Sequence, residues 1–351
     1  MFDGLTCRFT AAFFAIIASC LIFAFETDPK GAVMLTSELL PLIHEAANRV
    51  YSVVHETPLA PLPRHAELPN AGLAYAKLEQ LQTTGSFKLR GATNKLMSLS
   101  SEQAAAGVIT SSTGNHGLGV AAAAKFLGLD AEVFVSAQVT QAKQEKIRQQ
   151  GARVRVVGDD ALAAELAARE AAAETGRSYV SPYNDPHVVA GQGTVAVELL
   201  RQLPDMDAIF IATGGGGLIS GVGTLLHHAA PRVEVIGCWP ENSAVLYESL
   251  EAGRIVQAAE SPTLSESTAG GVEEGSITFD LCREVMHHGV LVTEDEILRA
   301  MRWGHAQGWA MEGASGVALA AYFKEAMRYA DRKAVVLICG GNPSPTIRDL
   351  L

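Results

Sequence analysis

The sequence has few cysteines and no motif that pairs them. There are five in 351 residues, none of them in a C-x-x-C arrangement: Cys7, Cys20, Cys238, Cys282 and Cys339. An odd number without paired spacings excludes a disulfide framework and a zinc ribbon. Unpaired cysteines are typical of a reducing compartment, which predicts a cytoplasmic location.

Positive charge is also scarce. The chain has 27 Lys and Arg against 38 Asp and Glu, a formal net charge of −11 at pH 7. A nucleic-acid partner would require a basic face, so the composition argues against one. A small anionic ligand stays open, because a local site can be positive within an acidic protein.

Only one long uncharged apolar run is present, residues 9–25. It is at the lower limit for a membrane-spanning helix and long for the core of a signal peptide. Three interpretations stay open: a true start at Met34, a membrane anchor, or a signal segment. The capped amphipathic pattern after Met34 favours the first. Residues 1–33 are therefore expected to lie outside the fold, with membrane contact only if the apolar run belongs to the protein.

From Met34 onward, short apolar stretches alternate with segments of helical periodicity. Strands are expected at residues 72–79, 107–112, 131–136, 152–158, 177–182, 208–213, 233–239 and 334–341. This alternation predicts an α/β protein with parallel, doubly wound sheets. Residues 109–185 read as a separate βαβα unit, which predicts a small mobile domain within a large domain made of residues 34–108 and 186–351.

Four consecutive glycines, Gly214 to Gly217, follow an apolar strand and open a helix. Without side chains, their backbone N–H groups can converge at the positive end of the helix, which predicts a phosphate site. The run is not a P-loop, because no Gly-Lys-Ser/Thr follows. A loose G-x-G-x-x-x-G through Gly221, with Glu241 after the next strand, keeps an NAD(P)-dependent dehydrogenase open as an alternative.

Hydroxyl groups mark a second strand end, in the stretch ITSSTGNHG. Ser112 and Thr113 stand where the strand becomes a helix, so they could hold a carboxylate or simply cap the helix. Asn115 and His116 in the first helical turn favour a site. At a third strand end, Cys339 taken alone is better interpreted as a small core residue.

Lys88 stands in the stretch GSFKLRGA, a frame that a surface lysine does not need. A framed lysine, a phosphate cradle and a carboxylate cradle together match the requirements of pyridoxal 5′-phosphate. This cofactor needs an amine for its aldehyde, an anion site for its phosphate and a group that faces its ring nitrogen.

Four motifs, SFKLRGA, STGNHG, GGGGLISG and CGGN, occur in the order and spacing of the fold-type II pyridoxal-phosphate enzymes. From Met34 to Leu351 the chain resembles their threonine/serine dehydratase and serine racemase branch. The resemblance implies a fold similar to the tryptophan synthase β chain, with two doubly wound parallel-sheet domains and the cofactor between them. It also implies pyridoxal 5′-phosphate as cofactor, an amino-acid substrate and a homodimer.

The same resemblance assigns roles to individual residues. The expected cofactor-binding residues are Phe87, Lys88, Asn115, Gly214, Gly215, Gly216, Gly217, Leu218, Glu312 and Cys339. Lys88 is expected to bond the cofactor and then to act as the base on the substrate. The substrate carboxylate is expected at Ser112, Gly114 and His116. Thr113 occupies the position of the second catalytic residue, a serine in racemases, and its extra methyl group disfavours efficient racemisation.

Two departures from the family pattern carry chemical consequences. Cys339 would face the ring nitrogen, and a thiol of pKa about 8.5 cannot hold a proton there by charge pairing. An unprotonated ring nitrogen favours β-elimination over transamination. Trp239 and Val245 stand where many relatives carry metal-binding acids, so no metal site is expected.

The predicted function is therefore a lyase that removes water and ammonia from a threonine- or serine-like β-hydroxy amino acid to give a 2-oxo acid. An amino-acid racemase with the same cofactor is an alternative. A second alternative is a dehydratase for a hydroxyectoine-derived amino acid, a subgroup that the stretch GCWPENS resembles.

Overall fold

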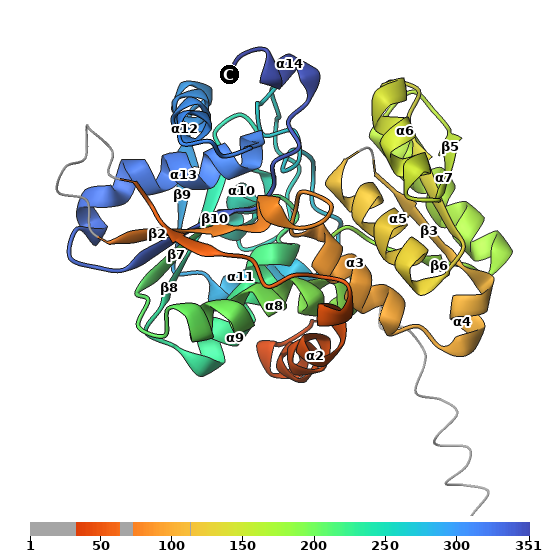
Figure 1. Cartoon of the computed structure of the whole chain (residues 1–351), viewed down its shortest axis with the longest axis horizontal. Helices are drawn as coiled ribbons and strands as arrows, with labels where there is room; N and C mark the ends of the chain where they lie inside the picture. The colour runs from red at the N-terminus through yellow and green to blue at the C-terminus, as the bar shows by residue number, and fades with distance from the viewer. Residues whose placement is uncertain (1–32, 64–72, 113) are drawn as a thin grey trace, which may run out of the picture. The chain divides into compact units, whose positions relative to one another are not determined.

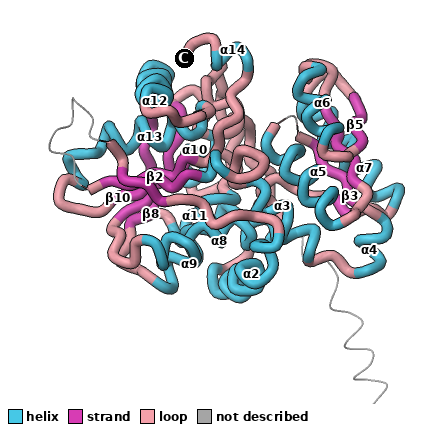
Figure 2. The backbone as a smooth tube through the Cα atoms, in the orientation of Figure 1, coloured by secondary structure: helices cyan, strands magenta, loops and turns pink. Residues whose placement is uncertain are grey.

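The computed structural model describes residues 33–63, 73–112 and 114–351. The predictions for residues 1–32, including the apolar run 9–25, and for Thr113 lie outside these ranges. Within them, every helix is too short or too polar to cross a membrane. Two β-sheets organise the described chain, and both are visible in Figures 1 and 2.

The larger sheet has six strands in the order β1-β2-β10-β7-β8-β9. Their bounds are Leu59–Pro61 (β1), Ala74–Leu78 (β2), Ala208–Ala212 (β7), Glu234–Pro240 (β8), His288–Val292 (β9) and Ala334–Ile338 (β10). All neighbours are parallel except β1, which pairs antiparallel with β2. The central strands β7 and β10 are buried throughout, which explains their uninterrupted apolar sequences.

Two edge strands were not predicted from the sequence. Strand β1 has only three residues and ends in a proline, a residue that cannot donate to the ladder and is confined to sheet edges. Strand β9 is half-exposed at the opposite edge, so it lacks the apolar run of a central strand. The antiparallel β1 is thus an addition to the predicted parallel sheet.

Helices cover both faces of the larger sheet (Figure 1). One face carries α12 (Glu294–Ala306) and α13 (Gly313–Glu325), and the other carries α2 (Thr36–Arg49), α8 (Pro186–Gln202) and α9 (Gly217–Ala229). The remaining helices of this part are α10 (Val245–Ala252), α11 (Ile277–Val285) and the short α14 (Pro345–Arg348). The largest apolar core fills the space between this sheet and its helices.

The second sheet has four parallel strands in the order β5-β4-β3-β6. It consists of β3 (Val108–Ser111), β4 (Ala131–Val135), β5 (Arg153–Val156) and β6 (Ser178–Tyr179), with α5 (Asn115–Leu127), α6 (Gln141–Gln149) and α7 (Ala161–Thr175). We call this unit, residues 108–179, the small lobe. One small apolar cluster lies entirely within it, and a second is shared with α3 (Lys88–Met97) and the start of α8. The predicted domain of residues 109–185 covers all of it except Val108, and its mobility stays a prediction.

The chain reaches the small lobe through α3 (Lys88–Met97) and α4 (Ser101–Ala106). The start of α3 is bound to the end of β10: Phe87 N donates to Cys339 O at 3.1 Å, and Gly341 N donates to Gly85 O at 2.9 Å. An isolated bridge between Ser86 and Gly340 completes this contact. The lysine and the cysteine singled out in the sequence are therefore held side by side by backbone hydrogen bonds.

A buried ion cluster fixes α3 from its other side. Arg90 Nη1 donates to Glu198 Oε1 at 2.6 Å and Arg90 Nη2 donates to Glu79 Oε1 at 2.8 Å. Lys77 Nζ donates to Glu198 Oε2 at 2.5 Å. All four side chains have no exposed surface. The cluster therefore joins α3 to β2 and α8. It explains why an arginine, Arg90, stands two residues after Lys88.

Candidate active site

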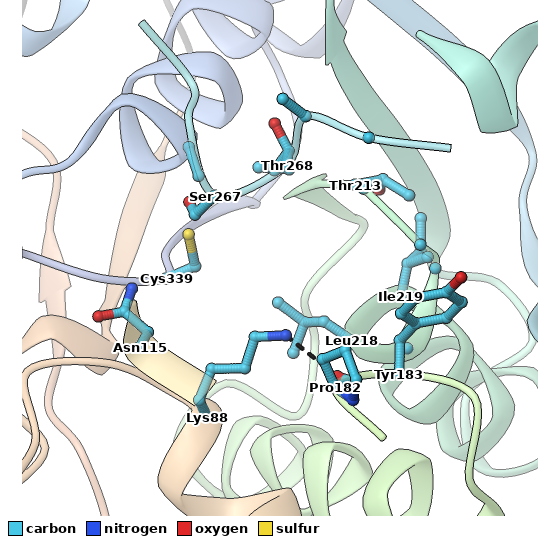
Figure 3. A pocket seen from close by; sticks show the side chains of 18 of the residues that line it. Lys88, Asn115, Pro182, Tyr183, Thr213, Leu218, Ile219, Ser267, Thr268 and Cys339 are labelled. Atoms are coloured by element: carbon cyan, nitrogen blue, oxygen red, sulfur yellow. Dashed lines mark hydrogen bonds between the residues drawn. The ribbon is translucent and has the colours of Figure 1, made fainter. Parts of the chain in front are cut away.

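A cavity of about 180 Å³ lies at the carboxyl ends of β7 and β10 (Figure 3). Four helices begin at its walls: Lys88 is the first residue of α3, Asn115 of α5 and Gly217 of α9, while Glu312 is the N-cap of α13. Each helix N-terminus carries partial positive charge. Their convergence favours an anionic ligand.

The structure brings the whole predicted cofactor-binding set to this one cavity. Its lining includes Phe87, Lys88, Asn115, Gly214, Gly215, Gly216, Gly217, Leu218, Glu312 and Cys339. These residues come from five separate parts of the sequence. The assignment of a role to each of them stays a proposal, but their proximity is a feature of the fold.

Lys88 is the only cationic side chain among the described residues that line the cavity. Its Nζ donates to Pro182 O at 3.1 Å and lies 5.2 Å from the centre of the Phe87 ring. Burial lowers the pKa of Lys88 to about 8, although nearby Cys339 and Glu312 act in the opposite direction. A substantial fraction of this amine is therefore neutral, and nucleophilic, near physiological pH.

The tetraglycine loop presents free donors to the cavity. The backbone N–H groups from Gly214 to Ile219 have no acceptor among the described residues, and the N-cap of α9, Gly216, has no side chain to supply one. Buried N–H groups without partners are rare in folded proteins. A phosphate group bound at this helix N-terminus would satisfy several of them.

Packing explains why glycine is needed in this loop. A Cβ at Gly215 would lie 2.6 Å from ring carbons of Tyr183, so the ring covers the loop closely. Gly216 has φ of +84°, a left-handed conformation that side chains disfavour. Tyr183 was not predicted, and it forms one wall of the cavity.

Cys339 and Glu312 form another part of the cavity wall, and their protonation and hydrogen bonds define its chemistry. Burial raises the pKa of the Cys339 thiol, with a further contribution from Glu312, so the thiol stays protonated. The Glu312 carboxylate accepts hydrogen bonds from Asn115 Nδ2 at 2.7 Å and Ser267 Oγ at 2.9 Å. Asn342 Nδ2 in turn donates to Asn115 Oδ1 at 2.8 Å. The asparagine and the acid are thus held in fixed positions.

The predicted carboxylate-binding residues lie beside the cavity and not in its lining. Ser112 Oγ accepts a hydrogen bond from Gly114 N at 3.2 Å. His116 is buried, its Nε2 lies 3.0 Å from Val180 O, and burial, together with the charge of Lys88, lowers its pKa to about 3. Its imidazole is therefore neutral. Thr113 lies outside the described residues, so the proposed role of this loop stays a prediction.

The sequence did not point to another group of lining residues. These are Pro182, Tyr183, Thr213, Ile219, Ser267, Thr268, Ala269, Gly270 and Gly271. Residues 267–271 belong to an irregular segment between α10 and α11, and their only sequence signal was a pair of glycines. Pro182 and Tyr183 follow the carboxyl end of β6, a position at which ligands bind in parallel sheets.

Two predictions concern residues that lie away from this cavity: the dehydrogenase alternative and the expected absence of a metal site. Glu241, the acid of the dehydrogenase alternative, is exposed and does not line it. Trp239 is buried at the end of β8, and Val245 is buried at the start of α10. The described residues contain no group of three or more His, Cys, Asp or Glu side chains placed to hold a metal.

The cavity fits pyridoxal 5′-phosphate on three observations of this structure. It offers a lysine amine that is partly neutral near pH 8, a row of unpaired N–H donors for the phosphate, and a neutral thiol for an unprotonated ring nitrogen. Each of these meets a different chemical requirement of the cofactor.

Comparisons with known proteins agree with this fit. An L-threonine ammonia-lyase of Thermotoga maritima is 39% identical over 304 residues, which cover 86% of this chain and 74% of that protein. The processed form of threonine deaminase isoform 2 from Solanum lycopersicum has a TM-score of 0.85 at 32% identity, covering 92% of this chain and 94% of its own. Serine racemase from Dictyostelium discoideum has a TM-score of 0.80 at 33% identity, covering 87% and 98%.

The family described as "Pyridoxal-phosphate dependent enzyme" matches residues 50–340, which include the lysine, the glycine loop and the cysteine of the cavity. The predicted fold class and cofactor are confirmed, since the similar solved structures share the fold. The chain belongs to the pyridoxal-phosphate dependent enzymes of fold-type II.

Proposed function

We propose that this enzyme is an ammonia-lyase that removes water and then ammonia from a β-hydroxy amino acid, giving a 2-oxo acid. The observation that carries the proposal is the placement of Lys88 and the tetraglycine loop in one cavity with a neutral Cys339. The relatives named above as threonine ammonia-lyase and threonine deaminase support it.

The residues that hold the cofactor follow from the cavity. The N–H groups of the tetraglycine loop would hold its phosphate, Lys88 would bond its aldehyde, and Cys339 would face its ring nitrogen. When bound, pyridoxal phosphate supplies an electron-withdrawing ring system that acidifies the α-carbon of an attached amino acid. Asn115, held by the Glu312 carboxylate, would donate to an oxygen of the ring.

Lys88 Nζ is the group that moves the proton. An amine with pKa about 8 is neutral often enough to accept a proton from the substrate α-carbon, which an ordinary lysine is not. Ser112, Gly114 and His116 belong to the loop that would hold the substrate carboxylate. Because His116 is neutral, this loop holds it by hydrogen bonds and not by an ion pair.

The lining limits the class of substrate. Lys88 is the only cation among the described lining residues, and Glu312 is the only acid. A second substrate carboxylate would meet no positive side chain, so burying it would be costly. We therefore favour monocarboxylic substrates such as serine and threonine over 3-hydroxyaspartate.

A panel of substrates tests the function. Purified enzyme with pyridoxal phosphate is given L-threonine, L-serine, 3-hydroxyaspartate and a hydroxyectoine-derived amino acid, and ammonia, 2-oxo acid and D-serine are measured. We expect ammonia and oxo acid in equal amounts from threonine or serine. Lys88→Ala is the control and should give neither. Dominant D-serine would instead support the racemase alternative, and no turnover of any substrate would refute the lyase.

Two further parts of the proposal concern the cellular compartment and the oligomeric state of the enzyme. We place it in the cytoplasm, because its unpaired cysteines suit a reducing compartment. We also propose that it acts as a homodimer. Sedimentation of the purified protein tests this second point, and a single species of monomer mass at micromolar concentration would contradict it.

A further inference from the structure

A polar cluster connects the small lobe to the cavity wall. Its centre is Glu273, which follows the lining residues 267–271 in the segment between α10 and α11. Arg169 of α7 donates from Nη2 to Glu273 Oε1 at 2.7 Å. From another side, Asn184 Nδ2 donates to Glu273 Oε2 at 2.9 Å. One carboxylate thus joins a small-lobe helix to the segment that leads into α8.

Contacts within the small lobe hold the Arg169 side chain in position for this ion pair. Its Nε and Nη2 donate to Glu165 Oε1 at 2.9 Å and 2.8 Å, one helical turn away. Its guanidinium lies 4.5 Å from the centre of the Tyr179 ring. A side chain already fixed in this way loses little conformational freedom when it pairs with Glu273.

The cluster reaches the cofactor loop through two neighbouring residues. Tyr183 Oη accepts a hydrogen bond from Glu273 N at 3.0 Å, and the Tyr183 ring covers Gly215. Asn184 Oδ1 accepts from Ile277 N at 3.1 Å, at the start of α11. A displacement of Glu273 would therefore disturb both the Tyr183 wall of the cavity and the start of α11.

We propose that Arg169 and Glu273 are positioning residues that hold the small lobe against the cavity wall. The inference rests on the proposed function, because an amino acid must enter the cavity and water must then be excluded. The pair is partly exposed, at 39% and 30% of the two side chains. Such a pair contributes little to global stability, and it can break each time the cavity opens.

The test compares Arg169→Gln, Glu273→Gln and the double variant with the wild type, all as holoenzymes. Glutamine at 273 can still accept from Asn184, so the change isolates the contact with Arg169. Arg153→Gln is the matched control, since Arg153 forms a more exposed pair with Asp130 at 2.6 Å within the small lobe. The readouts are amide hydrogen exchange of residues 264–275 and the separate values of KM and kcat.

We expect each single variant to speed exchange in residues 264–275 and to raise KM, both by about threefold, with kcat changed by less than about twofold. The double variant should be no worse than either single one, because both remove the same contact. High salt should raise KM of the wild type but not of the double variant.

Additive effects in the double variant, or an equal effect of Arg153→Gln, would overturn the proposal. Unchanged exchange in residues 264–275 would also do so. The exchange measurement needs no turnover, so it separates failure of this inference from failure of the proposed lyase function, which the substrate panel decides.

Discussion

At the scale of the residue, the chemistry depends on what surrounds one amine. A lysine amine normally has a pKa near 10.4 and stays protonated at neutral pH. At Lys88 burial lowers this pKa to about 8. The same residue is kept beside Cys339 by the hydrogen bond from Phe87 N to Cys339 O. The backbone places the amine, and burial makes it reactive.

The lowered pKa of Lys88 predicts how the apo-protein reacts with pyridoxal phosphate at different pH. Only the neutral amine attacks the aldehyde, and a lowered pKa means that the neutral form appears at lower pH. The rate of covalent attachment should rise about tenfold from pH 7 to pH 9 and then level off. Stopped-flow absorbance measures it. A rate that still rises about sevenfold between pH 9 and pH 10, as for an amine of pKa about 10.4, would show an ordinary lysine. Lys88→Ala should show no attachment.

At the scale of the element, the site is made by the ends of helices and strands. Helices α3, α5, α9 and α13 all begin at the cavity, where their unpaired N–H groups favour an anion. At helix α9 the first turn follows the glycine loop, so the N–H groups of that loop add to those of the helix end. The loop can approach Tyr183 only because it lacks Cβ atoms.

Gly215→Ala tests this close approach. The new Cβ would meet the Tyr183 ring, and overpacking of this kind should weaken pyridoxal-phosphate binding by about 10- to 100-fold. Titration of the apo-protein followed by absorbance gives the Kd. The second change Tyr183→Ala in the same chain should recover part of the loss, because it removes the clashing ring. Wild-type affinity in Gly215→Ala alone would contradict the steric argument.

The buried ion cluster at the start of α3 is the second feature at this scale. Glu198 of α8 accepts from both Lys77 of β2 and Arg90 of α3, and none of these side chains is exposed. Removal of the shared acid would leave two buried cations without a full partner, and uncompensated buried charge is strongly destabilising.

Glu198→Gln should therefore lower the free energy of unfolding by about 3–5 kcal/mol. Urea unfolding followed by circular dichroism measures the change. The matched control is Glu56→Gln, which removes the exposed pair with Arg201 at 3.0 Å and should cost less than about 1 kcal/mol. Equal costs for the two variants would mean that burial of the cluster is not what makes it important.

At the scale of the whole molecule, two sheets contribute residues to one site. The larger sheet supplies the glycine loop and Cys339, while the small lobe supplies Asn115. Trp239 lies at the end of β8, where many relatives were expected to carry a metal-binding acid. This residue is buried and its ring centre lies 5.5 Å from that of Tyr247.

Magnesium or calcium should therefore leave global stability unchanged. A bound metal would stabilise the native state in proportion to the logarithm of its concentration, which at 100 times Kd amounts to about 2.7 kcal/mol. We expect the Tm of the holoenzyme to move by less than about 1 °C in millimolar metal or chelator. A rise of several degrees with either ion would reveal a site that Trp239 does not block.

Sequence reasoning succeeded where a local stretch carries the signal. A central strand appears as an apolar run, and a phosphate loop appears as consecutive glycines after such a run. It failed for β1 and β9, because short or half-exposed edge strands lack such a run.

By itself, the sequence identified the family and the cofactor and singled out ten residues that the fold gathers in one cavity, since each motif acts through its own backbone conformation. Only the tertiary structure decided which distant partners complete the site. Tyr183 over the glycine loop, Ser267 on Glu312, and Glu198 paired with Lys77 across 121 residues leave no periodic trace in the chain. The physical reason is that packing and buried charge pairing depend on proximity in space, which neighbouring residues do not encode.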